Sequence, residues 1–119
     1  MAGEKRPGLL LRVDGALVFV PASIATTVAH GARITRVAGA PDELLGIVLH
    51  EGQVVPVVAI GKGTTGTMVV CSYLGEPIAL AGGEVVQSGV TDVDGATLID
   101  LAAIYARIQA GGWSTRWGA

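Results

Sequence analysis

The sequence has few of the residues that usually mark an enzyme, a metal site or a disulfide-stabilised protein. Its single cysteine, Cys71, cannot form an internal disulfide, and the apolar residues before it predict a small core residue. The two histidines, His30 and His50, are far apart and lack the cysteine or glutamate cluster of a metal site. A net charge of −2 gives no basic field for nucleic acid, and no apolar run is long enough for a membrane span. We therefore expect a cytoplasmic protein that binds neither nucleic acid nor metal and does not insert into a membrane.

Catalytic patterns are also missing, so we expect no enzymatic activity and no cofactor. No nucleophile elbow is present, and Asp92, Asp94 and Asp100 do not follow the spacing of a calcium loop. Residues 61–66, GKGTTG, match the G-x-G-x-x-G pattern of dinucleotide sites. That mechanism needs a helix directly after the glycines, whereas residues 67–70 form a β-type run. The segment is therefore interpreted as a flexible connection between strands.

The abundant residues are glycine and medium-sized apolar side chains, which together predict many short strands. Half of the residues are hydrophobic, yet the aromatic ones are only two Trp, two Tyr and one Phe. Eighteen glycines separate the apolar runs without a collagen-like period. Repeated short strands joined by tight turns are typical of a mostly-β barrel or sandwich, which is the fold class we expect.

Three hairpins are predicted along the chain. They pair residues 9–13 with 16–20 around Asp14-Gly15, 45–50 with 53–60 around Glu51-Gly52, and 67–73 with 78–80 around 75–77. Pro56 has no amide hydrogen to donate, so it predicts an edge or a bulge at that point of its strand. Residues 85–86 add a short strand, and Asp94-Gly95 predicts a further turn.

Two helices and one helical turn are predicted. Ser23 would cap a short helix over about residues 23–30, with Gly31 as its stop, and a single turn would begin at Pro41. Near the end of the chain, four apolar residues follow the i, i+3, i+4, i+7 rule. They predict an amphipathic helix over about residues 100–109 that is capped by Asp100. The four residues are Leu101, Ile104, Tyr105 and Ile108.

Several segments together resemble the CheW-like domains of bacterial chemosensory systems. Residues 34–41 read ITRVAGAP, residues 45–48 LGIV and residues 52–58 GQVVPVV, at spacings similar to the central signature of that family. Residues 94–101, DGATLIDL, resemble its last strand and its entry into a C-terminal helix. The resemblance covers about residues 9–109. It implies two small SH3-like β-barrels side by side, which couple a chemoreceptor tip to a CheA-type histidine kinase without catalysis or cofactor. It also implies a receptor site near the groove between the barrels and kinase contacts at apolar barrel ends.

The chain departs from the family pattern at several positions. Glu51 stands where the family usually has an arginine, Thr27 lies near the position of its partner glutamate, and Ala59 replaces an aspartate. The linker at 61–66 and the stretch between Val86 and Asp94 are short, so the second barrel is expected to be reduced. An incomplete barrel exposes a strand edge, which predicts self-association. We expect a disordered leader at 1–8, a CheW-like domain at 9–109 and a tryptophan-containing tail at 110–119.

The functional expectation is a non-catalytic scaffold that binds a chemoreceptor cytoplasmic domain, with the CheA-type kinase regulatory domain as a second candidate partner. The alternative is a divergent β-barrel interaction module that self-associates or serves another signalling complex. Glu51 is either a solvated turn residue or an interface residue that favours a basic partner over an acidic one. The two tryptophans either cover the helix or an open barrel end, or anchor a partner. The candidate partner-binding residues are Thr27, Val28, Glu51, Val54, Val86, Trp113 and Trp117.

Overall fold

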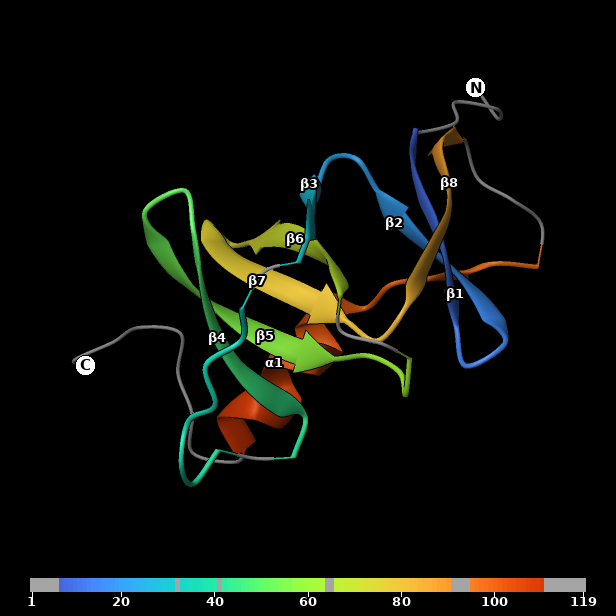
Figure 1. The fold of residues 1–119 in the computed structure, drawn as a ribbon. Helices are drawn as coiled ribbons and strands as arrows, with labels where there is room; N and C mark the ends of the chain where they lie inside the picture. The colour runs from blue at the N-terminus through green and yellow to red at the C-terminus, as the bar shows by residue number, and fades with distance from the viewer. Residues whose placement is uncertain (1–6, 32, 41, 64–65, 91–94, 111–119) are drawn as a thin grey trace.

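The structure is a computed structural model that describes residues 7–31, 33–40, 42–63, 66–90 and 95–110. Its strands form two sheets, one with the order β8-β1-β2-β9 and one with the order β3-β6-β7-β5-β4. In Figure 1 the five-stranded sheet lies on the left and β1, β2 and β8 lie on the right. The elements are β1 (Gly8–Val13), β2 (Ala16–Pro21), β3 (Ala25–His30), β4 (Leu44–His50), β5 (Gln53–Ala59), β6 (Thr67–Tyr73), β7 (Glu76–Ala81), β8 (Glu84–Val90), β9 (Thr97–Leu98) and α1 (Leu101–Ala110).

All three predicted hairpins are confirmed, and they share one turn chemistry. Each has a two-residue connection in which both residues have positive φ, as type I′ turns require. The third turn lies at Leu74 and Gly75 rather than at 75–77, so Pro77 already belongs to a strand. The φ angles are 50° and 87° at Asp14-Gly15, 50° and 78° at Glu51-Gly52, and 52° and 82° at Leu74-Gly75.

The helix predicted over residues 23–30 is wrong, because the segment forms β3 instead. The strand pairs antiparallel with β6 from Ala25 opposite Cys71 to His30 opposite Thr67. Ser23 lies in the turn before the strand rather than at a helix start. Two threonines and a valine follow one another at 26–28, and β-branched residues favour a pleated surface over a helix. The candidate residue Thr27 therefore projects from a sheet.

Pro56 lies in an inner strand, which corrects the expectation of an edge or bulge. β5 is bordered by β4 on one side and by β7 on the other. The proline is tolerated because pairing with β7 begins only at Val57, opposite Ala79. Its missing amide hydrogen therefore removes no bond from the β5–β7 ladder. The helical turn predicted to begin at Pro41 is seen as a turn at Asp42 and Glu43, directly followed by β4, whereas Pro41 itself lies outside the described residues.

The five-stranded sheet is buried on both faces. Side chains alternate along β6 and β7, as the twofold period of a strand requires. One face packs against an inner cluster, which consists of Val48, Val55, Val57, Met68, Val70, Ala79 and Ala81. The other faces a shared cluster, whose buried members are Leu11, Val20, Leu44, Val58, Val69, Cys71, Ile78, Leu80, Leu101, Ile104, Tyr105 and Ile108. The shared cluster joins both sheets and the helix in one core.

A backbone bridge ties the segment between β3 and β4 to the outer strand β4. Thr35 and Ile47 exchange two backbone hydrogen bonds, each 2.8 Å long. The approach is close enough that a Cβ on Gly46 would collide with the Thr35 carbonyl oxygen, and Gly46 also has a φ of 153°. Only glycine meets both requirements. The bridge therefore holds the segment around Thr35 against β4, with Ile34 packed against the inner cluster.

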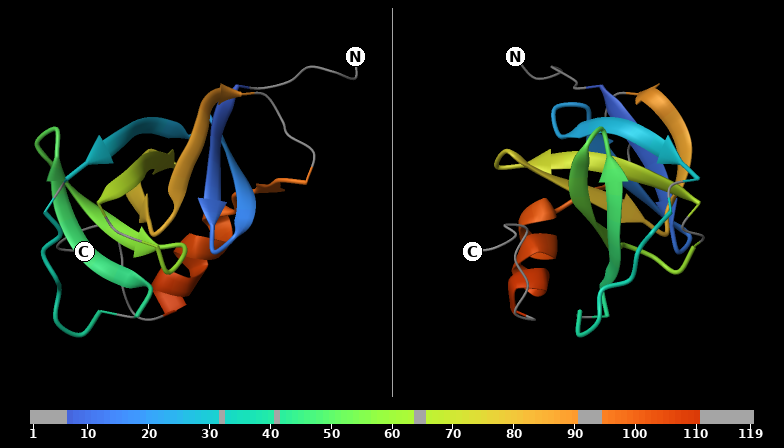
Figure 2. Two further views of the ribbon diagram at one scale, coloured as in Figure 1. Left: turned by 45° about the vertical axis from the view of Figure 1, so that its right-hand side comes forward. Right: turned by 60° about the vertical axis from the view of Figure 1, so that its left-hand side comes forward.

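The C-terminal helix is confirmed as α1, beneath the junction of the two sheets (Figure 2). Asp100 Oδ1 accepts a hydrogen bond of 3.0 Å from the Ala103 amide, as a helix N-cap does. All four residues that carried the helical pattern are buried. The Tyr105 ring stacks on Tyr73, with centroids 4.8 Å apart. Among the described residues, no helix has the length and apolar character needed to cross a bilayer.

The four-stranded sheet is the smaller of the two. β9 contributes only two residues, and β8 borders β1 alone among the described strands. Neither described ladder closes on itself, so the expected pair of barrels is seen here as two curled sheets. β1 begins at Gly8, one residue earlier than predicted. Residues 1–6 of the expected leader and 111–119 of the expected tail lie outside the described residues, and Ala110, at which the tail was expected to begin, is the last residue of α1.

Candidate protein-interaction surface

An apolar groove lies between the two sheets, where the start of β1 and the end of β8 approach β3. Its volume is about 210 Å³. The backbone of Gly8 packs so tightly that a Cβ there would collide with the Val20 carbonyl and the Phe19 ring. The Ala22 amide donates a 2.9 Å hydrogen bond to the Pro7 carbonyl, which fixes the turn between β2 and β3 beside the groove. The lining residues are Pro7, Gly8, Leu9, Ala22, Ala25, Thr27, Val28 and Gly89.

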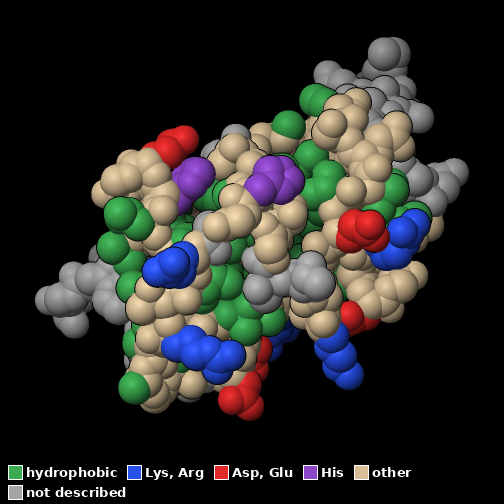
Figure 3. Space-filling model, in the orientation of Figure 1, with side chains coloured by type: hydrophobic (Ala, Val, Ile, Leu, Met, Phe, Trp, Pro, Cys, Tyr) green, Lys and Arg blue, Asp and Glu red, His purple; other side chains and the backbone are tan. Residues whose placement is uncertain are grey.

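A polar recess lies at the ends of two hairpins, those of β4–β5 and β6–β7. Its volume is about 280 Å³. Glu51 occupies the first turn position, and its side chain is 81% exposed. His50 Nε2 lies 3.7 Å from Glu51 Oε2, an ion pair only when the histidine is protonated. Both histidines lie on the face of the molecule shown in Figure 3. The lining residues are Thr27, His50, Glu51, Gln53, Val70, Cys71, Ser72, Gly75 and Pro77.

Cys71 lines this recess but is unsuited to be a nucleophile. The residue is fully buried, and its Sγ lies 3.9 Å from the Val69 carbonyl oxygen. Burial raises the pKa of the Cys71 thiol from 9.0 to about 12, because the thiolate would lose its hydration. The reactive form of cysteine is the thiolate, so the thiol is inert at neutral pH. The prediction that Cys71 is a small core residue is confirmed.

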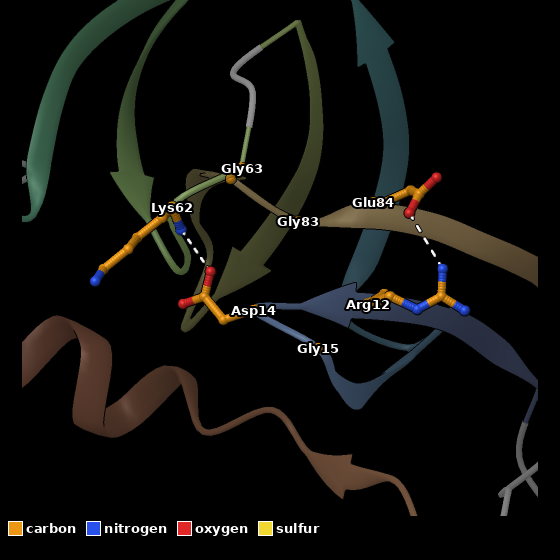
Figure 4. A pocket seen from close by; sticks show the side chains of 8 residues that line it. Arg12, Asp14, Gly15, Lys62, Gly63, Gly83 and Glu84 are labelled. Carbon is orange, nitrogen blue, oxygen red and sulfur yellow. Dashed lines mark hydrogen bonds and ion pairs between the residues drawn. The ribbon is translucent and has the colours of Figure 1, made fainter.

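A third pocket, at the opposite end of β1, is a junction rather than a binding site. Three of its four charged side chains engage residues of the pocket itself: Arg12 Nη1 lies 3.4 Å from Glu84 Oε1, and Asp14 Oδ1 accepts a 2.8 Å hydrogen bond from the backbone amide of Lys62. Figure 4 shows these contacts where the loop after β5 crosses the entry to β8. The pocket volume is about 550 Å³, and its lining residues are Arg12, Asp14, Gly15, Lys62, Gly63, Gly82, Gly83 and Glu84.

Two glycines of the G-x-G-x-x-G segment, Gly61 and Gly63, allow the loop after β5 to pass close to Gly82. A Cβ on Gly63 would lie 2.5 Å from the Gly82 carbonyl oxygen, and one on Gly82 would collide with the Gly61 carbonyl oxygen. The Gly63 amide also donates a 3.0 Å hydrogen bond to Gly82. Residues 61–63 are therefore held by backbone contacts, which corrects the interpretation of this part as a flexible connection. The strand β6 follows the loop, so the segment has no helix N-terminus to receive a phosphate.

Three of the candidate residues lie together. Thr27 and Val28 line the groove, and Thr27 and Glu51 line the recess. Val54 on β5 and Val86 on β8 are 44% and 41% exposed and line neither pocket. Trp113 and Trp117 lie outside the described residues. Among the described residues, no group of three or more His, Cys, Asp or Glu side chains could hold a metal ion.

Sequence reasoning missed most of the groove. Pro7 and Gly8 fell in the expected leader, and Ala22 and Ala25 fell in or beside the expected helix. For Ala22 and Ala25, the run of β-branched residues at 26–28 was a usable signal, because such residues favour a strand over a helix. Gly89 carried no local signal. It reaches the groove only because β8 pairs with β1 along its length.

Comparison with known proteins identifies the fold. No family model matches the chain, and no curated protein matches it. Among solved structures, the scaffolding protein TtCheW from Thermoanaerobacter tengcongensis is similar, with a TM-score of 0.62 and 16% sequence identity. The match covers 80% of this chain and 87% of that chain. At this identity the likeness shows a CheW-like, mainly β fold, and the activity of the chain must be argued from its own surface.

Proposed function

We propose that this chain is a non-catalytic, cytoplasmic scaffold of a chemosensory system that binds a chemoreceptor cytoplasmic domain in the groove between its two sheets. The observation that carries the proposal is the apolar groove, set between the sheets of a fold similar to a CheW scaffolding protein. Concave apolar surfaces between two structural units are preferred sites for binding. In this proposal the two curled sheets are the counterparts of the two SH3-like barrels.

The groove has the chemistry of a helix-binding surface. Of its eight lining residues, seven have apolar or no side chains, and Thr27 supplies the single hydroxyl. An amphipathic helix binds such a groove by placing apolar side chains from successive turns into it. Chemoreceptor cytoplasmic tips are helical coiled coils, so they present that type of surface.

The proposal is tested by adding charge to the groove at a position that does not disturb the core. Ala22 is an exposed turn residue at the groove, and Ala38 is an exposed turn residue that lines neither the groove nor the recess. Isothermal titration with a soluble chemoreceptor cytoplasmic fragment should show that Ala22→Glu weakens binding about ten-fold or more, since a charge would enter an apolar contact. Ala38→Glu should bind as the parent does. Absence of binding by the parent protein, or equal binding by the two variants, would contradict the proposal.

A CheA-type histidine kinase regulatory domain is the second partner to measure with the same variants. If it binds and Ala22→Glu leaves that binding unchanged, the kinase uses a surface apart from the groove.

The alternative, a self-associating module, is favoured by one observation on β8. That strand has a single neighbour among the described strands, and residues 86–89 are all exposed. An outer strand can pair with another chain, although two register shifts against β1 distort this one. Size-exclusion chromatography with light scattering decides between the two functions. A stable dimer that binds no receptor fragment would favour the module.

A further inference from the structure

Thr27 connects the apolar groove to the polar recess. The residue lines both pockets, with Val28 beside it in the groove and Glu51 across from it in the recess. Thr27 lies opposite Val70 of the inner cluster, whereas Val28 lies opposite Val69 of the shared cluster. The polar recess and the apolar groove therefore lie on the two faces of β3 and meet at Thr27. A partner segment that fills the groove and continues past Thr27 would bring its next residues over the recess.

The polar end carries a single carboxylate. Among the described residues that line the two pockets, Glu51 is the only acidic one, and no lysine or arginine lines either pocket. Its side chain is 81% exposed, so a cation can approach it from the solvent, although His50 Nε2 lies 3.7 Å from one of its two carboxylate oxygens. An acidic group at the same place would be repelled, because like charges brought together across an interface oppose binding.

We propose that these two adjoining pockets select a partner helix whose apolar stripe is followed by a lysine or arginine, with the stripe in the groove and the cation at Glu51. The inference rests on the proposed function, because it takes the groove as the docking site. What it adds is the charge class of the partner, which the groove alone leaves open.

Charge reversal on both sides of the interface tests the inference. The probe is the chemoreceptor cytoplasmic fragment, together with versions in which each lysine or arginine of its tip is changed to glutamate one at a time. We expect Glu51→Gln to weaken binding of the parent fragment about three-fold, which is typical of an exposed ion pair. Glu51→Lys should weaken it about ten-fold, since attraction becomes repulsion. One of the receptor fragments that carry a new glutamate should bind weakly to the parent protein but more tightly to the Glu51→Lys variant, because the two charges are then reversed together.

Asp42→Lys is the matched control. Asp42 is exposed and lines neither pocket. Its replacement by lysine changes the net charge as much as Glu51→Lys does, so Asp42→Lys should bind as the parent protein does. A three-fold to ten-fold loss with Asp42→Lys would show a general charge effect and overturn the inference.

The outcomes separate this inference from the function on which it rests. If Ala22→Glu weakens binding but Glu51→Lys binds the parent fragment as tightly as before, the groove stands and the charge selection is wrong. Failure of every glutamate fragment to regain affinity for Glu51→Lys would have the same meaning. If the parent protein binds no receptor fragment, both the proposed function and the charge selection are overturned.

Discussion

The two sheets of this chain are stabilised in different ways. The five-stranded sheet packs on both faces, with an inner cluster of its own and a shared cluster below it. A bridge between Thr35 and Ile47 also ties the segment before β4 to this sheet. Within the part of the chain that the structure describes, the four-stranded sheet has no separate buried cluster: Leu11 and Val20 belong to the shared cluster, and its other buried hydrophobic residues, Leu10 and Phe19, belong to neither cluster. Its outer strand β8 is largely exposed.

The difference indicates that the two sheets contribute unequally to one common core. The larger sheet and α1 supply most of the shared cluster, on which the smaller sheet depends for burial. The two candidate pockets depend on the sheets in different ways. The recess lies on the five-stranded sheet alone, whereas the groove is formed by residues of both sheets. Perturbing the shared cluster should therefore affect the whole molecule, and perturbing either sheet alone should affect less of it.

The largest effect is expected from Leu11→Ala in the shared cluster. Leu11 is 1% exposed, so removing its side chain should lower the free energy of unfolding by about 2–5 kcal/mol. Urea titration followed by far-ultraviolet dichroism and by tyrosine fluorescence should give coincident transitions, since both sheets share this core. Leu49→Ala is the control, with a change below about 0.5 kcal/mol, because Leu49 is 73% exposed. Separate transitions would show that the sheets unfold independently.

A smaller effect, confined to the five-stranded sheet, is expected from Gly46→Ala. The new Cβ would collide with the Thr35 carbonyl and break the bridge, which should cost about 2 kcal/mol of stability. Gly66→Ala is the control, since nothing lies within 4 Å of a Cβ there. Hydrogen exchange should become faster at the Thr35 and Ile47 amides before it changes in β1 and β2. Uniform acceleration across both sheets would contradict a local role for the bridge.

Alkaline pH should destabilise the protein through Cys71. The thiol pKa is about 12 in the folded state and 9.0 without burial, so above pH 9 the unfolded chain loses a proton that the folded chain keeps. The free energy of unfolding should therefore fall as pH rises from 9 toward 12, by about 1.4 kcal/mol at pH 10. Below pH 9 this contribution is fully present.

The Cys71→Ala variant isolates that effect from the titration of other groups. It should show a shallower fall in the free energy of unfolding over the same pH range, although it is less stable at neutral pH because a buried side chain is truncated. Parallel pH curves for the two proteins would mean that the thiol does not contribute. Rapid labelling of native protein by a thiol reagent at neutral pH would also contradict its burial.

The smallest effect is expected at the start of α1. Asp100→Ala removes the acceptor for the Ala103 amide and should lower stability by about 1 kcal/mol, whereas Asp100→Asn retains an acceptor and should lose less. Because α1 packs under both sheets, the loss should appear in the single global transition. Equal stability of the alanine and asparagine variants would show that the cap contributes nothing measurable.

Most of the fold could be predicted from local signals in the sequence. Asp14-Gly15 and Glu51-Gly52 defined hairpins because few residue pairs adopt two positive φ angles in succession. The spacing of Leu101, Ile104 and Ile108 defined α1 because one face of a helix repeats every 3.6 residues. β3 was missed because Ser23 and Gly31 resemble helix caps, while its pairing with β6 joins residues about forty positions apart.

The candidate site was predicted only in part. Thr27, Val28 and Glu51 were identified by their position within a resemblance, and the structure brings them to adjoining pockets. Pro7, Ala22 and Gly89 were not, since they meet only when β1 pairs with β8 and the turn after β2 folds back.

The sequence by itself determined the turns, the strand-rich composition and the amphipathic helix, because each depends on residues that are close together in the sequence. The tertiary structure decided which strands are neighbours, how two sheets share one core and where the groove lies. Those features depend on contacts between distant residues, such as the approach of Gly61 to Gly82 and of Gly46 to Thr35. A glycine at such a position indicates that a side chain would not fit there, but only the folded chain shows which backbone atoms occupy the space.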